Sequence, residues 1–325
     1  MSEKILITGA CGFIGSHLAE LCVKEGFNVV AFDRYNSNNH WGWLEDSNLS
    51  KDMEIILGDI RDYDSVNKAM DGCDNVFHLA ALIGIPYSYT SPLAYIRTNI
   101  EGTYNILESS KNKNIKQLII TSTSETYGNA NYTPIDENHS ISAQSPYAST
   151  KVAADQLSLS YHKSFELPVK IARPFNTYGP RQSSRAIIPT IINQILDNQK
   201  KIKLGNLKPT RDLTYVEDIC AAFLEIYKSD KFYGDVVNIG SKNEISVQTI
   251  FEKISSILDS KIELIQDDKR IRPKKSEVNQ LICDNSKILE NSNWKPKIDF
   301  DEGLLKTINW LKNNRSLSKS DLYHV

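Results

Sequence analysis

Tyr147-Ala-Ser-Thr-Lys151 places a phenol and an ammonium group four residues apart. On a helix, residues at this spacing lie on one face, one turn from each other. A nearby positive charge lowers the pKa of a phenol, so this tyrosine could act as a base near neutral pH. The spacing alone is weak evidence: among fifteen tyrosines about one such pair arises by chance, and Tyr227 with Lys231 is a second one. We interpret that second pair, at the end of a later helix, as a surface feature.

The segment Thr121-Ser-Thr-Ser-Glu125-Thr-Tyr-Gly128 supplies the context that favours Tyr147. It follows a predicted strand, and ligands of a doubly wound sheet bind beyond the carboxyl ends of its strands. Thr123 can hydrogen-bond a hydroxyl that is being oxidised, and Glu125 can exchange a proton with carbon. Hydroxyl residues often cap turns and a lone glutamate is usually solvated, so it is the combination that indicates a catalytic centre.

Gly9-Ala-Cys-Gly12-Phe-Ile-Gly15 follows the first predicted strand and opens the first predicted helix. Glycines there permit a tight turn and close approach to a pyrophosphate, which the free N–H groups of the helix start attract. Asp33, 18 residues beyond Gly15, can accept hydrogen bonds from ribose hydroxyls and repels a 2′-phosphate. The pattern predicts NAD rather than NADP, a preference that the neighbouring Arg34 weakens without reversing.

Two later strand ends extend the expected cofactor site. Asp59 follows the third predicted strand and is a candidate for the adenine end, and His78-Leu-Ala-Ala81 offers small residues against which a cofactor can lie. The residues expected to bind the cofactor are Gly9, Gly12, Phe13, Ile14, Gly15, Asp33, Arg34, Asp59, Ile60, Leu79, Ala80, Ala81, Tyr147 and Lys151.

The elements that position these residues alternate along the first half of the chain. Short β-branched runs predict strands over Lys4–Thr8, Asn28–Phe32, Glu54–Leu57, Asn75–Leu79, Gln117–Thr121 and Pro168–Ala172. Amphipathic stretches predict helices over Phe13–Lys24, Pro92–Ser110 and Pro146–Ser164. Such alternation is typical of right-handed crossovers, and it predicts an α/β fold with a doubly wound parallel (Rossmann) sheet.

The second half is less regular. Helices are predicted over Ile187–Asn198, Val216–Lys228, Val247–Leu258 and Phe300–Asn313, and strands over Ile202–Leu204, Val236–Ile239 and Ile262–Ile265. Val236–Ile239 could join the first sheet. We therefore expect two interleaved domains: residues 1–178 with about 213–242 bind NAD, and about 179–212 with 243–315 form a smaller α+β substrate domain. Residues 316–325 form a polar tail.

Composition excludes several classes of protein. Of 325 residues, 40% are hydrophobic and 24% charged, which is typical of a soluble globular protein, and a net charge of −2 gives no global attraction to nucleic acid or anionic membranes. Five scattered cysteines without a CxxC pair indicate reduced thiols and no metal site. There is neither a secretory signal pattern nor an apolar stretch of about 18 residues. We expect a cytoplasmic protein.

The complete set of motifs resembles the extended short-chain dehydrogenases, over roughly Lys4 to Asn313. The matching segments, in order, are the three glycines, Asp33, HLAA, TSTSETYG, SPYASTK, ARPFNTYGPRQ, LGNLKPTRDLTYVEDI and the late Trp294-Lys-Pro. The resemblance implies that Tyr147 takes the proton of a sugar C4 hydroxyl while hydride passes to NAD, with Thr123 beside it. Lys151 would hold the nicotinamide ribose and lower the pKa of the tyrosine.

Glu125 distinguishes branches of that family. In the similar nucleotide-sugar 4,6-dehydratases this glutamate removes the C5 proton, water leaves from C6, and the hydride returns to C6. Simple 4-epimerases generally lack it. Dehydratases of dTDP-glucose carry Asp-Glu where this chain has Ser124-Glu125, so the acid that protonates the leaving hydroxyl is either Glu125 itself or another group, with Ser124 as a hydrogen-bonding helper.

The resemblance also ranks possible substrates. UDP-glucuronate decarboxylases share Thr-Ser-Glu, but they differ from SPYASTK and from the stretch Ile83–Tyr87. LIGIPYSYTSP, TSTSETYG, RPFNTYGPRQSSRAIIPTII and RPKKSEV are together similar to the dehydratases of the legionaminic acid pathway, which act on GDP-N-acetylglucosamine. The alternatives are a decarboxylase or 4-epimerase that uses the same C4 oxidation and, from another class, a non-catalytic NAD-binding regulator.

Five residues are expected to line a substrate cleft. Guanidinium groups suit a diphosphate, and in this family the arginines that match Arg211 and Arg272 bind it, with Asn176 at the sugar phosphate. Arg185 is a further candidate, and Tyr87 should border the sugar. Trp41 and Trp43 could cover the cofactor or substrate, or simply pack. The helices 92–110 and 146–164 pair across a two-fold axis in many relatives, so a homodimer is expected.

Overall fold

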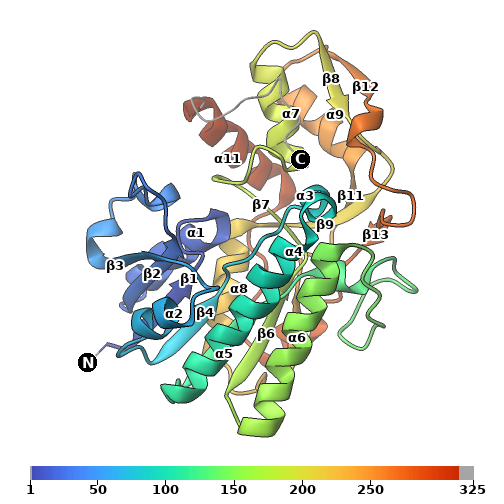
Figure 1. The fold of residues 1–325 in the computed structure, drawn as a ribbon. Helices are drawn as coiled ribbons and strands as arrows, with labels where there is room; N and C mark the ends of the chain where they lie inside the picture. The colour runs from blue at the N-terminus through green and yellow to red at the C-terminus, as the bar shows by residue number, and fades with distance from the viewer. Residues whose placement is uncertain (1, 315–325) are drawn as a thin grey trace.

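A seven-stranded parallel sheet forms the centre of the computed structural model, which describes residues 2–314 (Figure 1). Its strands, in spatial order, are β10 (Val236–Ile239), β6 (Val169–Pro174), β5 (Gln117–Thr121), β4 (Asn75–His78), β1 (Lys4–Thr8), β2 (Asn28–Arg34) and β3 (Met53–Gly58). The direction of winding reverses between β1 and β4, so a crevice for ligands is expected beyond their carboxyl ends. The expected doubly wound α/β fold is confirmed, including the return of β10 to this sheet. The predicted tail, 316–325, lies outside the described residues.

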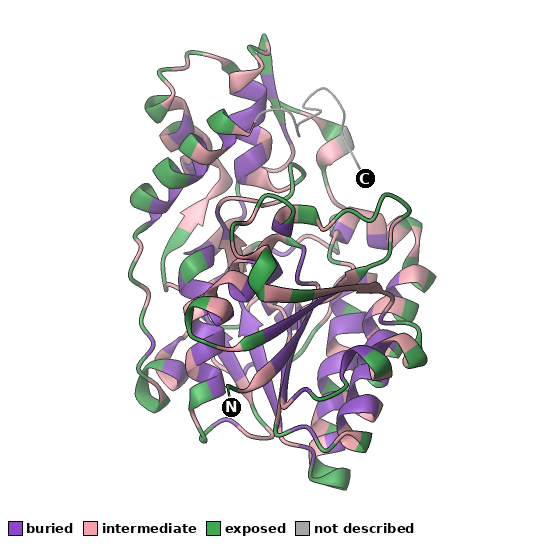
Figure 2. Cartoon of the chain, turned by 90° about the vertical axis from the view of Figure 1, so that its left-hand side faces the viewer, coloured by how far each residue is buried: buried purple, intermediate pink, exposed green. Residues whose placement is uncertain are grey.

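Helices cover both faces because the strands are apolar on both. Ile5 and Ile7 of β1 pack in one core cluster with Leu18 and Phe223, whereas Leu6 packs in the other. The first face carries α1 (Phe13–Lys24) and α8 (Val216–Lys228), and the second carries α2 (Tyr63–Ala69), α5 (Gly102–Asn112) and α6 (Pro146–Phe165). Figure 2 shows the buried residues concentrated along the sheet and on the helix faces turned towards it.

A smaller part lies beyond the carboxyl edge of the sheet (Figure 1). It contains α7 (Ile187–Leu196), α9 (Val247–Ile257), α11 (Phe300–Asn313) and the parallel pair β8 (Lys201–Leu204) and β12 (Glu263–Gln266). A mixed sheet of β11 (Glu244–Ser246), β9 (Thr210–Tyr215), β13 (Gln280–Leu281) and β7 (Asn176–Tyr178) connects it to the large sheet. Short helices are α3 (Ile85–Thr90), α4 (Pro92–Tyr95) and α10 (Ser286–Asn291). The sequence pattern did not predict β7 or β9, because both are short and rich in polar residues.

The prediction of a single helix over Pro92–Ser110 is wrong for the middle of this stretch. A π-helical segment, Ile96–Glu101, separates α4 from α5. Within it the Asn99 side chain hydrogen-bonds both the N–H (2.8 Å) and the C=O (2.9 Å) of Leu82, and also the Thr150 hydroxyl (3.0 Å). The wide turn therefore clamps the loop after β4, and π-helical segments of this kind are frequent at functional sites.

The interpretation of Tyr227 as a surface residue is also wrong. Its side chain is buried beside Phe27 and Phe77, and its hydroxyl donates to the Glu3 carboxylate. Helical spacing from Lys231 did not reveal that Tyr227 lies on the face of α8 that packs on the sheet. Only Lys231 is exposed.

The described helices include none with the length and apolar character needed to cross a bilayer. All five cysteines are buried and free. Within residues 2–314 no group of His, Cys, Asp and Glu side chains has the arrangement of a metal site.

A fully buried lysine fixes the end of α8 against the sheet. Lys170, in β6, donates to the carbonyls of Ile226 (3.0 Å), Tyr227 (3.1 Å) and Ser229 (2.6 Å), and its ammonium lies 4.2 Å from the centre of the Tyr233 ring. Burial lowers its pKa to about 8. The cation satisfies helix carbonyls that have no partner within the helix.

Lys170→Met should lower the free energy of unfolding by about 3 kcal/mol, because the carbonyls of α8 lose a buried, charged donor. Lys228→Met is the matched control: Lys228 is an exposed cation at the same helix end, and its loss should change stability by less than about 0.5 kcal/mol. Urea unfolding measures both. Equal, small effects of the two variants would show that Lys170 does not anchor the helix.

Candidate active site

The glycine turn after β1 forms a cradle that a dinucleotide fits. Gly9 has φ of +72°, and a Cβ there would lie 2.8 Å from the backbone nitrogen of Ala80. A Cβ on Gly15 would lie 2.0 Å from the carbonyl oxygen of Gly9. Gly12, in contrast, is exposed, and a Cβ there would meet only the carbonyl oxygen of Gly9, at 3.2 Å. Gly12 is the N-cap residue of α1 and provides no side-chain cap. The uncapped N–H groups of α1 thus face an open surface suited to a diphosphate.

Asp33 lies beside this turn at the end of β2. Its Oδ2 accepts the N–H of Cys11 (2.7 Å), and its Oδ1 accepts the N–H of Arg34 (2.6 Å). Burial raises its pKa, which these two backbone donors partly offset. The carboxylate is therefore held next to the glycine turn, as a ribose-binding acid requires.

Among the other expected cofactor residues, Ala80 and Asp59 differ in their surroundings. The Ala80 N–H donates to Thr8 Oγ1 (3.2 Å), which brings the backbone after β4 against the glycine turn. Asp59 instead forms an ion pair with Arg61, which holds its pKa below the usual range. Ile60 is buried beneath Gly102. The expected adenine-side acid is thus already paired within its own loop.

Tyr147 and Lys151 are both buried at the start of α6, 7% and 5% exposed. Ser145 caps this helix by accepting the N–H of Ala148 (3.1 Å). The Lys151 ammonium donates to the carbonyl of Thr121 (2.5 Å), which fixes the helix to the end of β5. The structure therefore brings the predicted pair to the predicted strand end.

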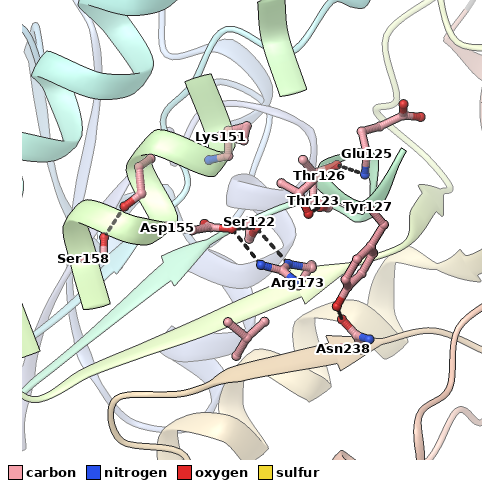
Figure 3. A network of polar contacts seen from close by, with 12 residues as sticks. Ser122, Thr123, Glu125, Thr126, Tyr127, Lys151, Asp155, Ser158, Arg173 and Asn238 are labelled. Atoms are coloured by element: carbon pink, nitrogen blue, oxygen red, sulfur yellow. Dashed lines mark hydrogen bonds and ion pairs between the residues drawn. The ribbon is translucent and has the colours of Figure 1, made fainter. Parts of the chain in front are cut away.

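Thr123, Ser124 and Glu125 form the short turn beyond β5. Thr123 caps this turn by accepting the N–H of Glu125 (3.3 Å), and it hydrogen-bonds the Tyr147 phenol. Ser124 is buried, whereas Glu125 is half-buried. Figure 3 shows Glu125 on the far side of Thr123 from Lys151.

Burial dominates the acid–base properties of this centre. It raises the pKa of Tyr147 above its ordinary value, an effect that the Thr123 hydrogen bond opposes and the Glu125 charge reinforces. Burial also lowers the pKa of Lys151. The protein alone therefore keeps the phenol protonated, and additional positive charge is needed before Tyr147 can act as a base.

The arginines of the expected diphosphate site share one carboxylate. Glu277 Oε1 lies 4.0 Å from Nη2 of Arg211 and 3.7 Å from Nη1 of Arg272. Nη1 of Arg272 is buried without a hydrogen-bond partner. Glu125 also faces Arg211 closely enough to raise its pKa against the lowering by burial. This pair of guanidinium groups can accept an anion beside the Glu125 turn.

The remaining substrate candidates lie around the same opening. Asn176 starts β7, and its Oδ1 is buried without a partner. A Cβ on Gly84 would lie 3.4 Å from Nη1 of the exposed Arg185, so this arginine reaches the loop before α3. The ring of Tyr87 is 6.1 Å from that of Tyr95, which is 6.2 Å from Tyr147.

The aromatic insertion after β2 packs on two sides. The N–H of Trp43 donates to the carbonyl of Cys11 in the glycine turn (3.0 Å), and its ring lies 5.2 Å from that of Trp310 in α11. Trp41 is partly buried and packs against the core cluster that contains Leu18 and Phe223. The insertion thus joins the glycine turn to the smaller part of the molecule.

Several residues at the site were not predicted from sequence. They are Tyr95, Asn99, Asp155, Arg173 and Glu277. Asp155 follows Lys151 by one helical turn, so the same spacing argument that paired Tyr147 with Lys151 could have found it. Tyr95 and Arg173 could not be found in this way, because they approach from other elements.

Comparison with known proteins places this geometry in a family. Residues 6–307 match the protein family described as GDP-mannose 4,6 dehydratase. The chain is 33% identical to dTDP-D-glucose 4,6-dehydratase of Dictyostelium discoideum, over 97% of this chain and 82% of that protein. It is 34% identical to UDP-N-acetyl-alpha-D-glucosaminuronate decarboxylase of Bacillus cytotoxicus, over 96% and 98%.

A solved structure shows a similar arrangement of the whole chain. It is UDP-glucuronic acid 4-epimerase from Bacillus cereus in complex with UDP-glucuronic acid and NAD, with a TM-score of 0.87 and 30% identity over 96% of this chain and 99% of that one. A dehydratase, a decarboxylase and an epimerase are thus about equally similar to this chain, so overall similarity does not distinguish the three reactions.

His78 links the cofactor side of the site to the first turn of α5. It is 2% exposed and hydrogen-bonds Thr8 Oγ1 (2.7 Å) and Thr103 Oγ1 (3.1 Å). Burial, together with the Lys151 charge, lowers its pKa to about 3. The imidazole is therefore neutral in the folded protein at any pH at which the protein is handled.

His78 should make the protein sensitive to mild acid. The unfolded chain binds a proton near pH 6.5 and the folded one does not, so stability is complete above that pH and falls as the pH drops towards about 3, by about 1.4 kcal/mol per pH unit. His78→Gln should reduce the slope between about pH 6 and pH 4 in urea unfolding by about 1.4 kcal/mol per pH unit, and the remaining slope includes that of His17, whose pKa burial lowers to about 4. His40→Gln, at an exposed site, should leave the slope unchanged. A slope in His78→Gln equal to that of the parent would contradict the assignment.

Proposed function

Because the chain belongs to the family described as GDP-mannose 4,6 dehydratase, within the extended short-chain dehydrogenases, we propose that it is an NAD-dependent nucleotide-sugar 4,6-dehydratase. The observation that carries the proposal is the position of Glu125. This carboxylate lies two residues beyond Thr123, close enough to Tyr147 and Arg211 to affect the pKa of each. A carboxylate beside Tyr147, the base for oxidation at C4, can reach the proton on the neighbouring C5. A 4-epimerase has no need to remove that proton.

The glycine cradle, Asp33 and the backbone after β4 fit NAD, and they would hold its diphosphate and adenosine ribose. Bound there, NAD would supply a hydride acceptor for C4 and the same hydride for C6, so the reaction would have no net redox change. Lys151 would hold the nicotinamide ribose. The cofactor and Lys151 together supply the positive charge that the buried phenol of Tyr147 requires.

The protein's own residues then move two protons. Tyr147 accepts the proton of the C4 hydroxyl, which Thr123 orients by hydrogen bonding. The C4 ketone acidifies C5–H, and Glu125 removes that proton. Loss of the C6 hydroxyl as water needs one proton, which Glu125 can deliver because it has just been protonated, with Ser124 near it. Return of the hydride to C6 leaves the enolate of the C4 ketone. C5 of this enolate takes one proton from solvent, and Tyr147 releases to solvent the proton that it took from the C4 hydroxyl, so the products are the 4-keto-6-deoxy sugar and water.

We propose a GDP-sugar as substrate, with GDP-N-acetylglucosamine of legionaminic acid biosynthesis as the specific case. The proposal of the sugar rests on the similarity of segments 82–92, 121–128, 173–192 and 272–278 to that group of dehydratases. Arg211 and Arg272 would bind the diphosphate, with Asn176 at the sugar phosphate and Arg185 and Tyr87 around the sugar. In this scheme residues 1–178 with about 213–242 bind NAD, and the rest of the described chain binds the nucleotide sugar.

We further propose that the enzyme is a cytoplasmic homodimer. Exposed apolar side chains lie along α4 to α6 and the π-helical segment, namely Leu93, Ile96, Tyr104 and Phe165. Exposed apolar side chains on neighbouring helices favour association between helices of two copies. Free, buried cysteines suit a reducing compartment. A monomeric mass in sedimentation equilibrium would contradict the dimer.

Incubation with GDP-N-acetylglucosamine in deuterated water tests the reaction and its substrate together. A product lighter by one water and carrying deuterium at C5 is the expected result in mass spectrometry. Loss of carbon dioxide from UDP-glucuronate would indicate the decarboxylase, and a product of unchanged mass the epimerase. No turnover of any nucleotide sugar would indicate an NAD-binding regulator.

Glu125→Gln should retain C4 oxidation, seen as NADH absorbance that accumulates, yet lose C5 deuterium exchange by at least about 100-fold, because only the C5 base is removed. Tyr147→Phe is the control at the preceding step: it should bind NAD and form no NADH. Deuterium incorporation at the parent rate in Glu125→Gln would identify another base.

A further inference from the structure

A buried network lies behind the catalytic centre (Figure 3). Asp155 Oδ2 accepts hydrogen bonds from the Ser122 hydroxyl (2.5 Å) and from Nη2 of Arg173 (2.9 Å), and Nε of Arg173 also donates to Ser122 Oγ (3.2 Å). All three residues are at most 3% exposed. None of them was assigned to substrate or cofactor above.

The network touches the catalytic residues through the backbone of β5. Ser122 stands between Thr121, whose carbonyl accepts the Lys151 ammonium, and Thr123, which hydrogen-bonds Tyr147. The N–H of Ser122 is fixed as well, by the carbonyl of Ala172 in β6 (2.7 Å). Holding Ser122 from both sides therefore sets where its two neighbours point.

The charges of the network are unequal. Of two buried cations, Arg173 forms an ion pair with the buried Asp155 carboxylate, and Lys151 precedes Asp155 by one turn on the same helix. The second oxygen of Asp155, Oδ1, is buried without a hydrogen-bond partner. An unpaired carboxylate oxygen in a core is costly unless cations around it balance its charge.

We propose that Asp155 and Ser122 are positioning residues of this active site: Asp155 supplies the negative charge that keeps the buried Lys151 protonated, and Ser122 holds Thr121 and Thr123 towards Lys151 and Tyr147. Neither residue contacts the reacting atoms. The inference deepens the proposed function, because it concerns the base that Tyr147 provides.

The electrostatics agree with this assignment. Burial lowers the pKa of Lys151, and Asp155 is the charge that opposes the lowering. His78, whose pKa the Lys151 charge also lowers, is neutral, since its pKa is about 3. Tyr147 faces Glu125, Asp155 and Tyr95, each of which raises its pKa.

Asp155→Asn should lower the pH at which Lys151 loses its proton. Burial lowers the pKa of Lys151, and Asp155 is the charge that opposes this lowering, so removing the Asp155 charge leaves the effect of burial unopposed.

The experiment is an NMR pH titration of the Lys151 side chain in the NAD-loaded protein, with Lys151→Met identifying the signal. Parent, Asp155→Asn and Ser158→Ala are compared. Ser158 is an equally buried serine on the same helix that donates only to the Ala154 carbonyl (2.7 Å), so its variant should titrate like the parent. An unshifted titration in Asp155→Asn would overturn the role of Asp155.

Ser122→Ala tests the proposed role of Ser122, and it still gives a result if Asp155→Asn does not fold. It leaves every charge in place, so kcat should fall roughly tenfold at unchanged KM, and Ser158→Ala should keep the parent kcat. Parent-like kcat in Ser122→Ala would overturn its role. A shifted titration in an enzyme that turns over no nucleotide sugar would contradict the proposed function and leave this inference standing.

Discussion

The hydrogen bond from the buried Lys151 ammonium to the carbonyl of Thr121 is the interaction on which the active site depends. It crosses from the first turns of α6 to the end of β5, and it therefore fixes Tyr147 above the turn that carries Thr123 and Glu125. A charge can stay in such a dry place only with compensating partners, which explains why the residues behind it are polar and themselves buried. The helix, the strand end and the reactive phenol are consequently one rigid unit.

Most of this fold could be predicted from sequence because its signals are local. β-branched runs gave the seven strands of the large sheet, and Gly9 to Gly15 with Asp33 marked the dinucleotide cradle. The failures had tertiary causes. Asn99 widens a helix by bonding a distant loop, β9 is a polar strand that pairs only in the assembled protein, and Tyr227 is buried on the apolar face of α8 although Lys231, which defined its predicted pair, is exposed. At the site, Glu277 and Arg173 come from segments whose approach no spacing rule foresees.

Relatives named for three different reactions share this architecture. In the proposed mechanism Tyr147, Lys151 and the cradle serve the oxidation at C4, which does not by itself decide the product. Under the same proposal the product depends on groups around the other side of the sugar, which are Glu125 near C5, Arg211 and Arg272 at the diphosphate, and Arg185 with Tyr87 around the sugar.

The contact between Trp43 and Trp310 bears on whether the bound dinucleotide exchanges with the dinucleotides of the cell. The loop that carries Trp43 is hydrogen-bonded to the glycine turn, and the ring contact attaches it to α11, so contacts with two distant parts of the chain hold this edge of the cradle. A catalyst that gives back the hydride it borrows gains nothing from exchanging its dinucleotide. If this loop kept the dinucleotide bound, the rate of product formation would not depend on the surrounding ratio of oxidised to reduced nicotinamide.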